Sequence, residues 1–155
     1  MDVLKILIVA GLVVYVVVAR LAGRPLVAKD VYVLPLIMVV IGIHGLRELD
    51  LSVADLLWLV VTGLCGVAFG ALRAATTVVF QKGGVLWQRY TGRTLVVWAL
   101  TLVAGFGVGA LAVAAGMNPE ARSMPISVGV GLLGEAVVIL LKSARSGVPY
   151  AQSRR

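Results

Sequence analysis

The sequence predicts an all-α membrane protein with five transmembrane helices and a short cytoplasmic β-hairpin between the third and fourth. Three observations carry this prediction. The 155 residues are 61% hydrophobic and only 14% charged, apolar runs long enough to cross a bilayer recur along the chain, and one interruption between them looks like two strands around a glycine turn. A soluble domain would carry about a quarter charged residues, and so short a chain cannot bury this much apolar surface in a globular core.

Five segments have the length of a membrane-spanning helix, which needs about 20 mostly apolar residues and tolerates about 17 to 25. The second and fifth are short, so we expect them to draw in flanking residues. The first does not resemble a cleaved signal peptide, because no basic segment leads it and no small-x-small site follows it. Residues 1–142 are therefore predicted to form one polytopic membrane domain, followed by a basic cytoplasmic tail at 143–155. The predicted spans are 3–19, 31–46, 56–72, 94–115 and 126–141.

The basic residues alternate between the connections. Of the 14 Lys and Arg, eleven fall on one side of the predicted membrane, and only Lys5, Arg47 and Arg122 fall on the other. The positive-inside rule then predicts an N-terminus outside and a cytoplasmic C-terminus, with eleven basic residues facing an anionic inner leaflet. This arrangement explains the basic net charge without nucleic acid as a partner.

The hairpin is predicted over residues 76–90. Residues 76–80 and 85–90 are rich in β-branched and aromatic types, and Lys82-Gly83-Gly84 supplies the turn. We expect Val79, Val85 and Trp87 on one face, with Lys82 and Arg89 in solvent. The segment suits the membrane interface, as a docking edge for a partner strand or as a plain connector. Its predicted interfacial residues are Arg73, Trp87, Arg89, Tyr90 and Arg93.

Glu135 is the most distinctive polar residue, because it lies midway along the fifth predicted span. An acid at that depth is costly and points to function by default. Tyr15 and Thr101 are expected at similar depth, and either hydroxyl is a candidate hydrogen-bond partner for Glu135. Arg20 and Arg73, at the inner helix ends, are expected to reach toward it only in part. Three roles stay open: a proton or cation site, a polar anchor between subunits, and a structural hydrogen bond between helices.

A second, weaker cluster consists of His44, Arg47 and Glu48. Positions 44 and 48 share a helix face, but they lie at the outer end of the second span, where wetting and capping explain them. One His and one cysteine, Cys65, exclude a Cys/His zinc site within one chain and an internal disulfide. We therefore predict no metal, no cofactor and no catalytic residue.

Small residues recur at helix-packing spacing. Gly66 and Gly70 form one pair, and Gly105 and Gly109 another. Small residues let helices approach closely in lipid, so these pairs predict helix contacts. The contacts would lie inside the monomer or in a homodimer. Pro35 is expected at the start of the second helix, where proline is tolerated.

Several segments resemble the CcdC-like group of small bacterial membrane proteins, particularly its actinobacterial branch. They are "ARLAGRPL", "LPLIMVVIGIHGL", "GALRAATTVVFQKGGVLWQRYTGRTL" and "VVWAL", within residues 15–105, and residues 70–76 are the most specific part. The group takes its name from a gene neighbourhood associated with cytochrome c biogenesis, and the resemblance implies no established activity. The chain has no Cys-x-x-Cys and no haem-ligand pair.

The sequence thus favours a non-enzymatic accessory or scaffold protein that contacts another membrane component. The alternative is a small transporter, or an ion or lipid pathway, with Glu135 as its polar element. A membrane enzyme ranks last, because such enzymes usually need a constellation of acids, histidines or a metal site.

Overall fold

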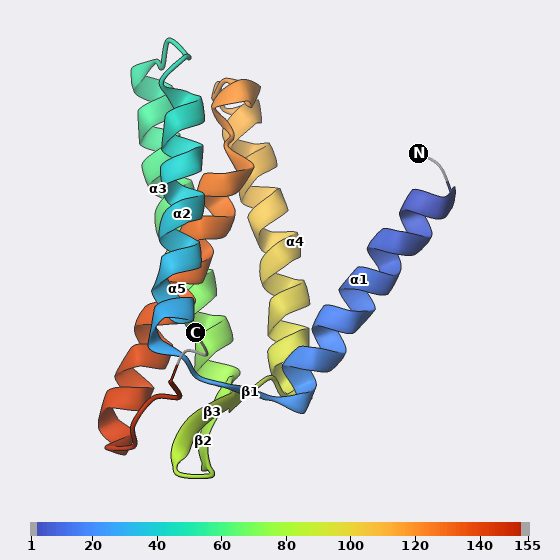
Figure 1. Ribbon diagram of the computed structural model, residues 1–155. Helices are drawn as coiled ribbons and strands as arrows, with labels where there is room; N and C mark the ends of the chain where they lie inside the picture. The colour runs from blue at the N-terminus through green and yellow to red at the C-terminus, as the bar shows by residue number, and fades with distance from the viewer. Residues whose placement is uncertain (1–2, 153–155) are drawn as a thin grey trace.

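A computed structural model of the chain describes residues 3–152, including, within the first helix, the side chains of residues 3, 7, 11, 14, 15 and 18–22 (Figure 1). Long helices stand side by side, and a small sheet closes one end of them. We call this the sheet end and the opposite end the loop end. The elements in chain order are α1 (Val3–Ala22), β1 (Arg24–Pro25), α2 (Ala28–Leu46), α3 (Val53–Thr76), β2 (Val78–Lys82), β3 (Val85–Arg89), α4 (Gly92–Ala114), the short 3₁₀ helix η1 (Pro119–Ala121) and α5 (Met124–Ser146).

Five long helices are present, as predicted, but the structure supports four candidate spans rather than five. Among the described residues, α2, α3, α4 and the stretch from η1 through α5 (Pro119–Ser146) are long and apolar enough to cross a membrane. Predicted segment 3–19 lies within α1, which is not one of the four. The expected extension of the short segments is confirmed, since α2 begins at Ala28 and α5 continues to Ser146. The predicted tail therefore starts inside a helix, and its Arg154 and Arg155 lie outside the described residues.

Local sequence sets the helix starts. Ser52 and Asp55 form a capping box at the start of α3, and Thr91 and Thr94 form another at the start of α4. Each box satisfies backbone N–H groups that have no partner within the helix. Asp55 also accepts the backbone N–H of Asn118 at 2.7 Å, so the same carboxylate ties the α4–α5 connection to α3. Pro35 lies in the interior of α2 rather than at its start, which corrects its predicted place.

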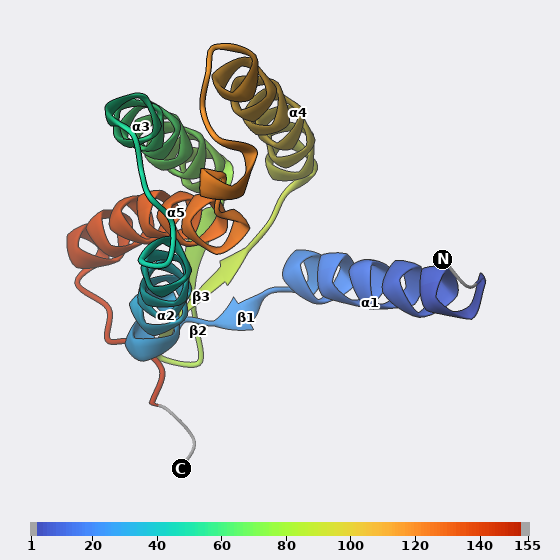
Figure 2. The same ribbon diagram turned by 90° about the horizontal axis from the view of Figure 1, so that it is seen from above.

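Helix α5 is the centre of the bundle and packs between α2 and α3 (Figure 2). Its contact with α3 is made by glycines. A methyl group at Gly70 would overlap the carbonyl of Gly131, and one at Gly134 would overlap the carbonyl of Val67. Gly66 faces the same contact. The Gly66/Gly70 pair thus packs inside the monomer, so a homodimer through this pair is not supported.

The second predicted pair, on α4, behaves differently. A Cβ at Gly105 would meet no atom within 4 Å, whereas one at Gly109 would meet the guanidinium of Arg122 at 2.6 Å. Gly109 therefore accommodates an arginine from the connection to α5. The guanidinium carbon of Arg122 also lies 5.6 Å from the ring centre of Phe106.

Helix α1 leaves the bundle. It diverges from the other helices and meets them at the sheet end (Figures 1 and 2). Val14, Tyr15 and Val18 are all more than half exposed. An apolar helix with this much free side-chain surface is suited to lipid or protein contact rather than to water.

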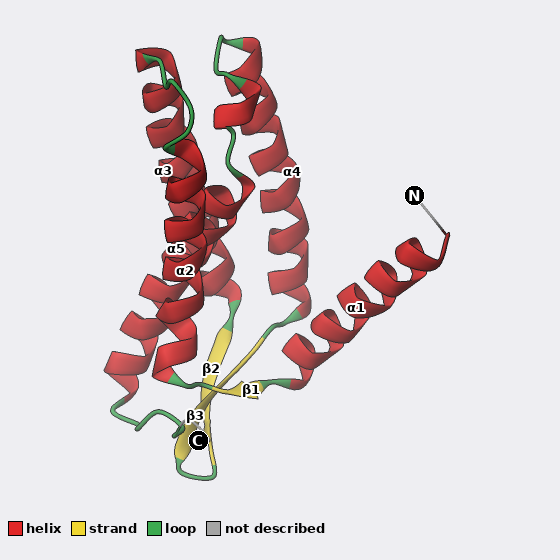
Figure 3. Ribbon diagram, turned by 45° about the horizontal axis from the view of Figure 1, so that its top comes forward, coloured by secondary structure: helices red, strands yellow, loops and turns green. Residues whose placement is uncertain are grey.

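The predicted hairpin is part of a three-stranded antiparallel sheet of order β1-β3-β2 (Figure 3). Its turn is the pair Gly83-Gly84, with φ of 61° and 78°, and Lys82 belongs to β2 opposite Val85. Both turn residues are in the left-handed region, which glycine adopts without strain. The third strand was not predicted, because two residues leave no alternating pattern to detect.

Strand pairing corrects the predicted faces. Residues directly opposite each other share a face, so Phe80 and Trp87 lie on one face and Val79 and Gln88 on the other. The prediction that Val79 shares a face with Trp87 is wrong. Lys82 and Arg89 are exposed as expected, each over an aromatic ring: the Lys82 ammonium is 4.7 Å from the ring centre of Trp87.

Two apolar clusters close the two ends. At the sheet end, Leu26, Ala74, Leu86 and Ile139 are buried, so the inner face of the sheet is fixed to α3 and α5. At the loop end the buried set is Leu46, Ala112, Met117 and Ala121.

Gly70→Ala should destabilise the fold. The added methyl group would meet the Gly131 backbone, and overpacking of this kind typically costs about 1–3 kcal/mol. The thermal unfolding midpoint in detergent is expected to fall. Gly63→Ala on the same helix is the matched control, because a Cβ at Gly63 meets nothing within 4 Å. Equal stability of the two variants would show that the α3–α5 contact is looser than described.

Candidate functional site

Glu135 is buried inside the bundle, with 5% of its surface exposed. Its Oε1 accepts a hydrogen bond from the Tyr90 hydroxyl at 2.7 Å. Its Oε2 lies 3.6 Å from Nε of Arg73, whose side chain is only 11% exposed. A buried carboxylate is tolerable when a cation and a hydrogen-bond donor compensate its desolvation. Both partners are present here.

Arg73 connects this acid to a third helix. Its Nη1 donates to the Thr101 hydroxyl at 3.4 Å, and that hydroxyl donates to the Trp98 carbonyl. The cluster of Glu135, Arg73, Thr101 and Tyr90 therefore joins α5, α3, α4 and the segment after β3. We call these four residues the Glu135 cluster.

Glycine makes room for the guanidinium. A Cβ at Gly131 would lie 3.1 Å from Nη2 of Arg73, closer than ordinary contact. The glycines that bring α3 onto α5 thus also admit the arginine between the helices. The close helix contact and the buried ion pair depend on each other.

Tyr90 is held where β3 passes into α4. Its N–H donates to the Arg20 carbonyl at 2.9 Å, and the Arg20 guanidinium lies 5.2 Å from its ring centre. Burial of the phenol, with the nearby Glu135 charge, raises the pKa of Tyr90 well above its ordinary value. The phenol therefore stays protonated at neutral pH and is a hydrogen-bond donor to the acid.

The predicted partners of Glu135 are only partly those observed. Tyr15 is 66% exposed on α1, and the hydroxyl that bonds to Glu135 belongs to Tyr90. Thr101 reaches the acid through Arg73. Arg73 and Tyr90 were expected at the lipid headgroups, and both instead turn into the bundle. The sequence signal for such a partner was that a buried acid requires a cation. Spacing along the chain could not select which of the basic residues pairs with Glu135.

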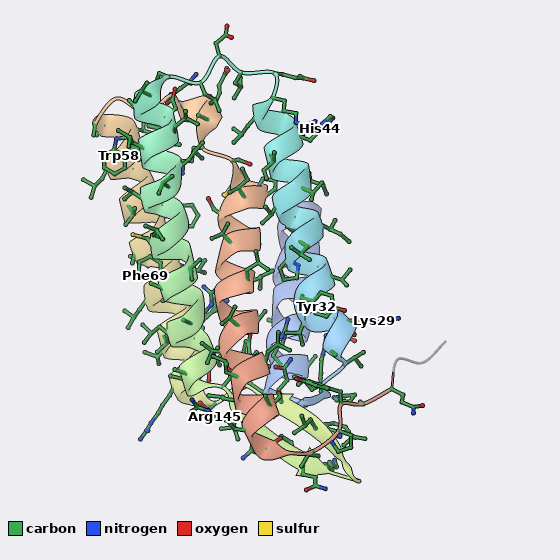
Figure 4. The ribbon with its side chains drawn as sticks, turned by 90° about the vertical axis from the view of Figure 1, so that its left-hand side faces the viewer. Lys29, Tyr32, His44, Trp58, Phe69 and Arg145 are labelled. Carbon is green, nitrogen blue, oxygen red and sulfur yellow. The ribbon has the colours of Figure 1, made fainter. Side chains whose placement is uncertain are left out.

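Of the remaining interfacial residues, Arg89 and Arg93 are exposed, and Trp87 is half-buried beside Phe80. His44, Arg47 and Glu48 are exposed at the loop end, and Figure 4 shows His44 pointing away from the bundle. No group of three or more His, Cys, Asp or Glu within residues 3–152 could hold a metal ion.

A pocket of about 150 Å³ lies beside the Glu135 cluster. The end of α1, the α1–α2 linker, β3, α2 and α5 form its walls. Its polar lining is Arg20, Arg24, Asp30, Gln88 and Glu135. The exposed positions of Arg24 and Asp30 place its mouth at the surface.

Lys142 has a structural role that sequence reasoning missed. Its ammonium donates to the carbonyls of Ala74, Ala75 and Thr77, at 2.7 to 2.9 Å. These carbonyls lie at the C-terminal end of α3, where helices leave acceptors unpaired and favour cations. A residue expected only as an inner-leaflet charge therefore caps a neighbouring helix.

Glu135→Gln should destabilise the protein strongly. Glutamine can still accept the Tyr90 hydrogen bond but cannot balance Arg73, and removing one partner of a buried pair typically costs about 3–5 kcal/mol. A large fall in the thermal unfolding midpoint in detergent is the expected result. Glu120→Gln, at an exposed acid of the loop end, should leave it unchanged.

The double variant Glu135→Gln/Arg73→Gln separates the pair from the individual side chains. Removing both charges should restore part of the lost stability, and a double-mutant cycle measures the coupling. A coupling energy near zero would contradict the ion pair as the reason for the burial of Glu135.

No protein-family model, curated protein or solved structure compared with this chain matches it.

Proposed function

We propose that this chain is a non-enzymatic accessory protein of a membrane, which contacts another membrane component through its sheet end. The observation that carries this proposal is the open edge of the sheet. β3 is the central strand, and its far side is occupied by β1 and by the C-terminal segment, where the Leu86 N–H donates to the Pro149 carbonyl. β2 has no strand on its other side among the described residues.

Strand register shows which groups that edge offers. In a hairpin with a two-residue turn, the residues flanking the turn form a hydrogen-bonded pair, and pairs alternate from there. Val79 and Gln81 then direct their backbone N–H and C=O away from β3. Leu86, opposite Gln81, fits this pattern, because its N–H and C=O bond to Pro149 and Leu26. Such an edge can take up an extended partner segment.

The pairing of Glu135 also favours an accessory role over a catalytic one. The carboxylate is compensated by Arg73 and Tyr90, and this pairing joins helices. The second candidate is a transporter or ion pathway, and one observation favours it: Glu135 lines the pocket.

For the orientation, we propose that the sheet end faces the cytoplasm, with the α1–α2 linker and the C-terminal end of α5 on that side of four spans. The predicted placement of the N-terminus outside requires a fifth span, and α1 is not among the four candidates. The support is the distribution of charge. The loop end carries Arg47 and Arg122 in the company of acids, and the sheet end gathers the other described basic residues from 20 onward, of which Figure 4 labels Lys29 and Arg145. Those described are Arg20, Arg24, Lys29, Arg73, Lys82, Arg89, Arg93, Lys142 and Arg145. We also propose, from the resemblance of residues 15–105 to the CcdC-like group, that this membrane is the bacterial cytoplasmic membrane.

Cysteine labelling tests this orientation. In a Cys65→Ala background, Lys82→Cys should react with a membrane-impermeant thiol reagent from the cytoplasmic side only. Lys82 is preferable to Gly83, whose φ of 61° would strain a cysteine. Glu48→Cys at the loop end should react only from outside. The reverse pattern would overturn the orientation.

Photocrosslinking tests the proposed contact. A photoreactive residue at Lys82 should give a discrete adduct in native membranes. Gln81→Pro should abolish this adduct, because it removes an edge N–H without breaking the β2–β3 ladder, as edge prolines allow. Gln81→Ala, which keeps the N–H, should retain it.

An adduct that survives Gln81→Pro would contradict docking at this edge. Proton or cation flux in liposomes that is lost in Glu135→Gln, in protein shown to be folded, would favour the transporter instead.

A further inference from the structure

The pocket beside the Glu135 cluster has a polar and an apolar part. Its polar groups come from the end of α1, the α1–α2 linker, the start of α2, β3 and α5. Its apolar lining comes from α2 and α5 and includes Leu34, Leu132 and Ile139. Because α2 and α5 are candidate spans, the apolar part lies on the membrane side. A pocket with this division suits an amphiphile.

The donors in the polar part suit a phosphate. Arg20 and Arg24 both line the pocket, and guanidinium groups bind phosphate oxygens with two matched donors. The pocket also borders the start of α2. The N-cap residue there is Val27, which lines the pocket, and no side chain caps the helix. Helix N-termini favour anions.

The acceptors in the polar part suit a headgroup that donates hydrogen bonds. Oε1 of Gln88 is buried and accepts no hydrogen bond from the described residues. Pro35 has no N–H, so the Val31 carbonyl one turn earlier loses its helical donor. The Asp30 carboxylate is the third acceptor in the lining. Of these, Gln88 Oε1 is the one recorded as buried, and buried acceptors are normally satisfied.

The charge of the pocket selects among headgroups. Arg20 and Arg24 contribute two positive charges, and Asp30 contributes one negative charge. Glu135 is balanced by Arg73. The remainder is one positive charge, which matches a monoanionic phosphodiester.

We propose that this pocket binds the headgroup of a membrane phospholipid. The phosphodiester lies on Arg20 and Arg24, and hydroxyl or ammonium groups of the head donate to Gln88 and Asp30. The acyl chains leave between α1 and α2, where Val18 and Leu34 are more than half exposed. This inference is independent of the proposed accessory role, because the pocket lies on the opposite side of β3 from the open edge of β2.

Native mass spectrometry of the purified full chain tests the proposal. The protein is mixed with equal amounts of phosphatidylglycerol, phosphatidylethanolamine and phosphatidylcholine that carry identical acyl chains. Phosphatidylglycerol should be retained most, because it is anionic and bears hydroxyl donors. Phosphatidylcholine, whose head has no donor, should be retained least.

Substitutions then locate the site. Arg24→Gln should weaken phosphatidylglycerol retention about tenfold or more, the scale of one lost charge-assisted contact. Gln88→Leu should reduce retention of phosphatidylglycerol and phosphatidylethanolamine but not of phosphatidylcholine. Arg89→Gln and Gln81→Leu are matched controls on exposed sheet positions. They should leave the retention of phosphatidylglycerol and of phosphatidylethanolamine unchanged. Unchanged thermal unfolding of Arg24→Gln would exclude misfolding as the cause.

Three results would overturn the proposal. One is equal retention of the three lipids, and another is pocket variants that behave like the controls. The third is displacement of phosphatidylglycerol by glycerol 3-phosphate at equal concentration, which would assign the pocket to a soluble phosphate compound.

Discussion

The close contact between α3 and α5 is the constraint on which the rest of the structure depends. Gly70 and Gly134 bring the two backbones together, and Gly131 leaves the space in which the Arg73 guanidinium meets Glu135. In lipid, helices gain little from burying apolar surface against one another, so close backbone packing and polar contacts have to supply the association. Both are concentrated here. Thr101 joins α4 to this pair, and Tyr90 joins to it the segment that follows β3.

The two ends of the bundle differ in chemistry. At the loop end a single carboxylate, Asp55, caps α3 and holds the connection to α5. At the sheet end, the hairpin, the α1–α2 linker and the C-terminal segment share one buried cluster around Leu26 and Leu86. Most of the basic residues and the pocket lie there too. The proposed partner contact and the proposed lipid site therefore both concern this end, through different surfaces of the same small sheet.

Apolar run length and turn chemistry predicted the helices and the hairpin well, because both are local properties. The glycine spacing on α3 was also informative, although its partner, α5, is distant in the sequence. The third strand, β1, was not predicted, because two residues are too few to show the alternating side-chain pattern of a strand. The faces of the hairpin were misassigned for Val79, since a shift in the turn by one residue changes the register of every pair. Pro35 was misplaced because α2 extends beyond its apolar core.

By itself the sequence determined the membrane class, the helical segments and the asymmetry of basic charge, which follow from composition and order along the chain. It also marked Glu135 as unusual. Only the tertiary structure decided what surrounds that acid. Arg73 and Tyr90 looked like interfacial residues, and Tyr15 looked like a partner. Which of them reaches Glu135 depends on how closely α3 approaches α5, and on the divergence of α1 from the bundle. Those are properties of packed surfaces that no single segment contains.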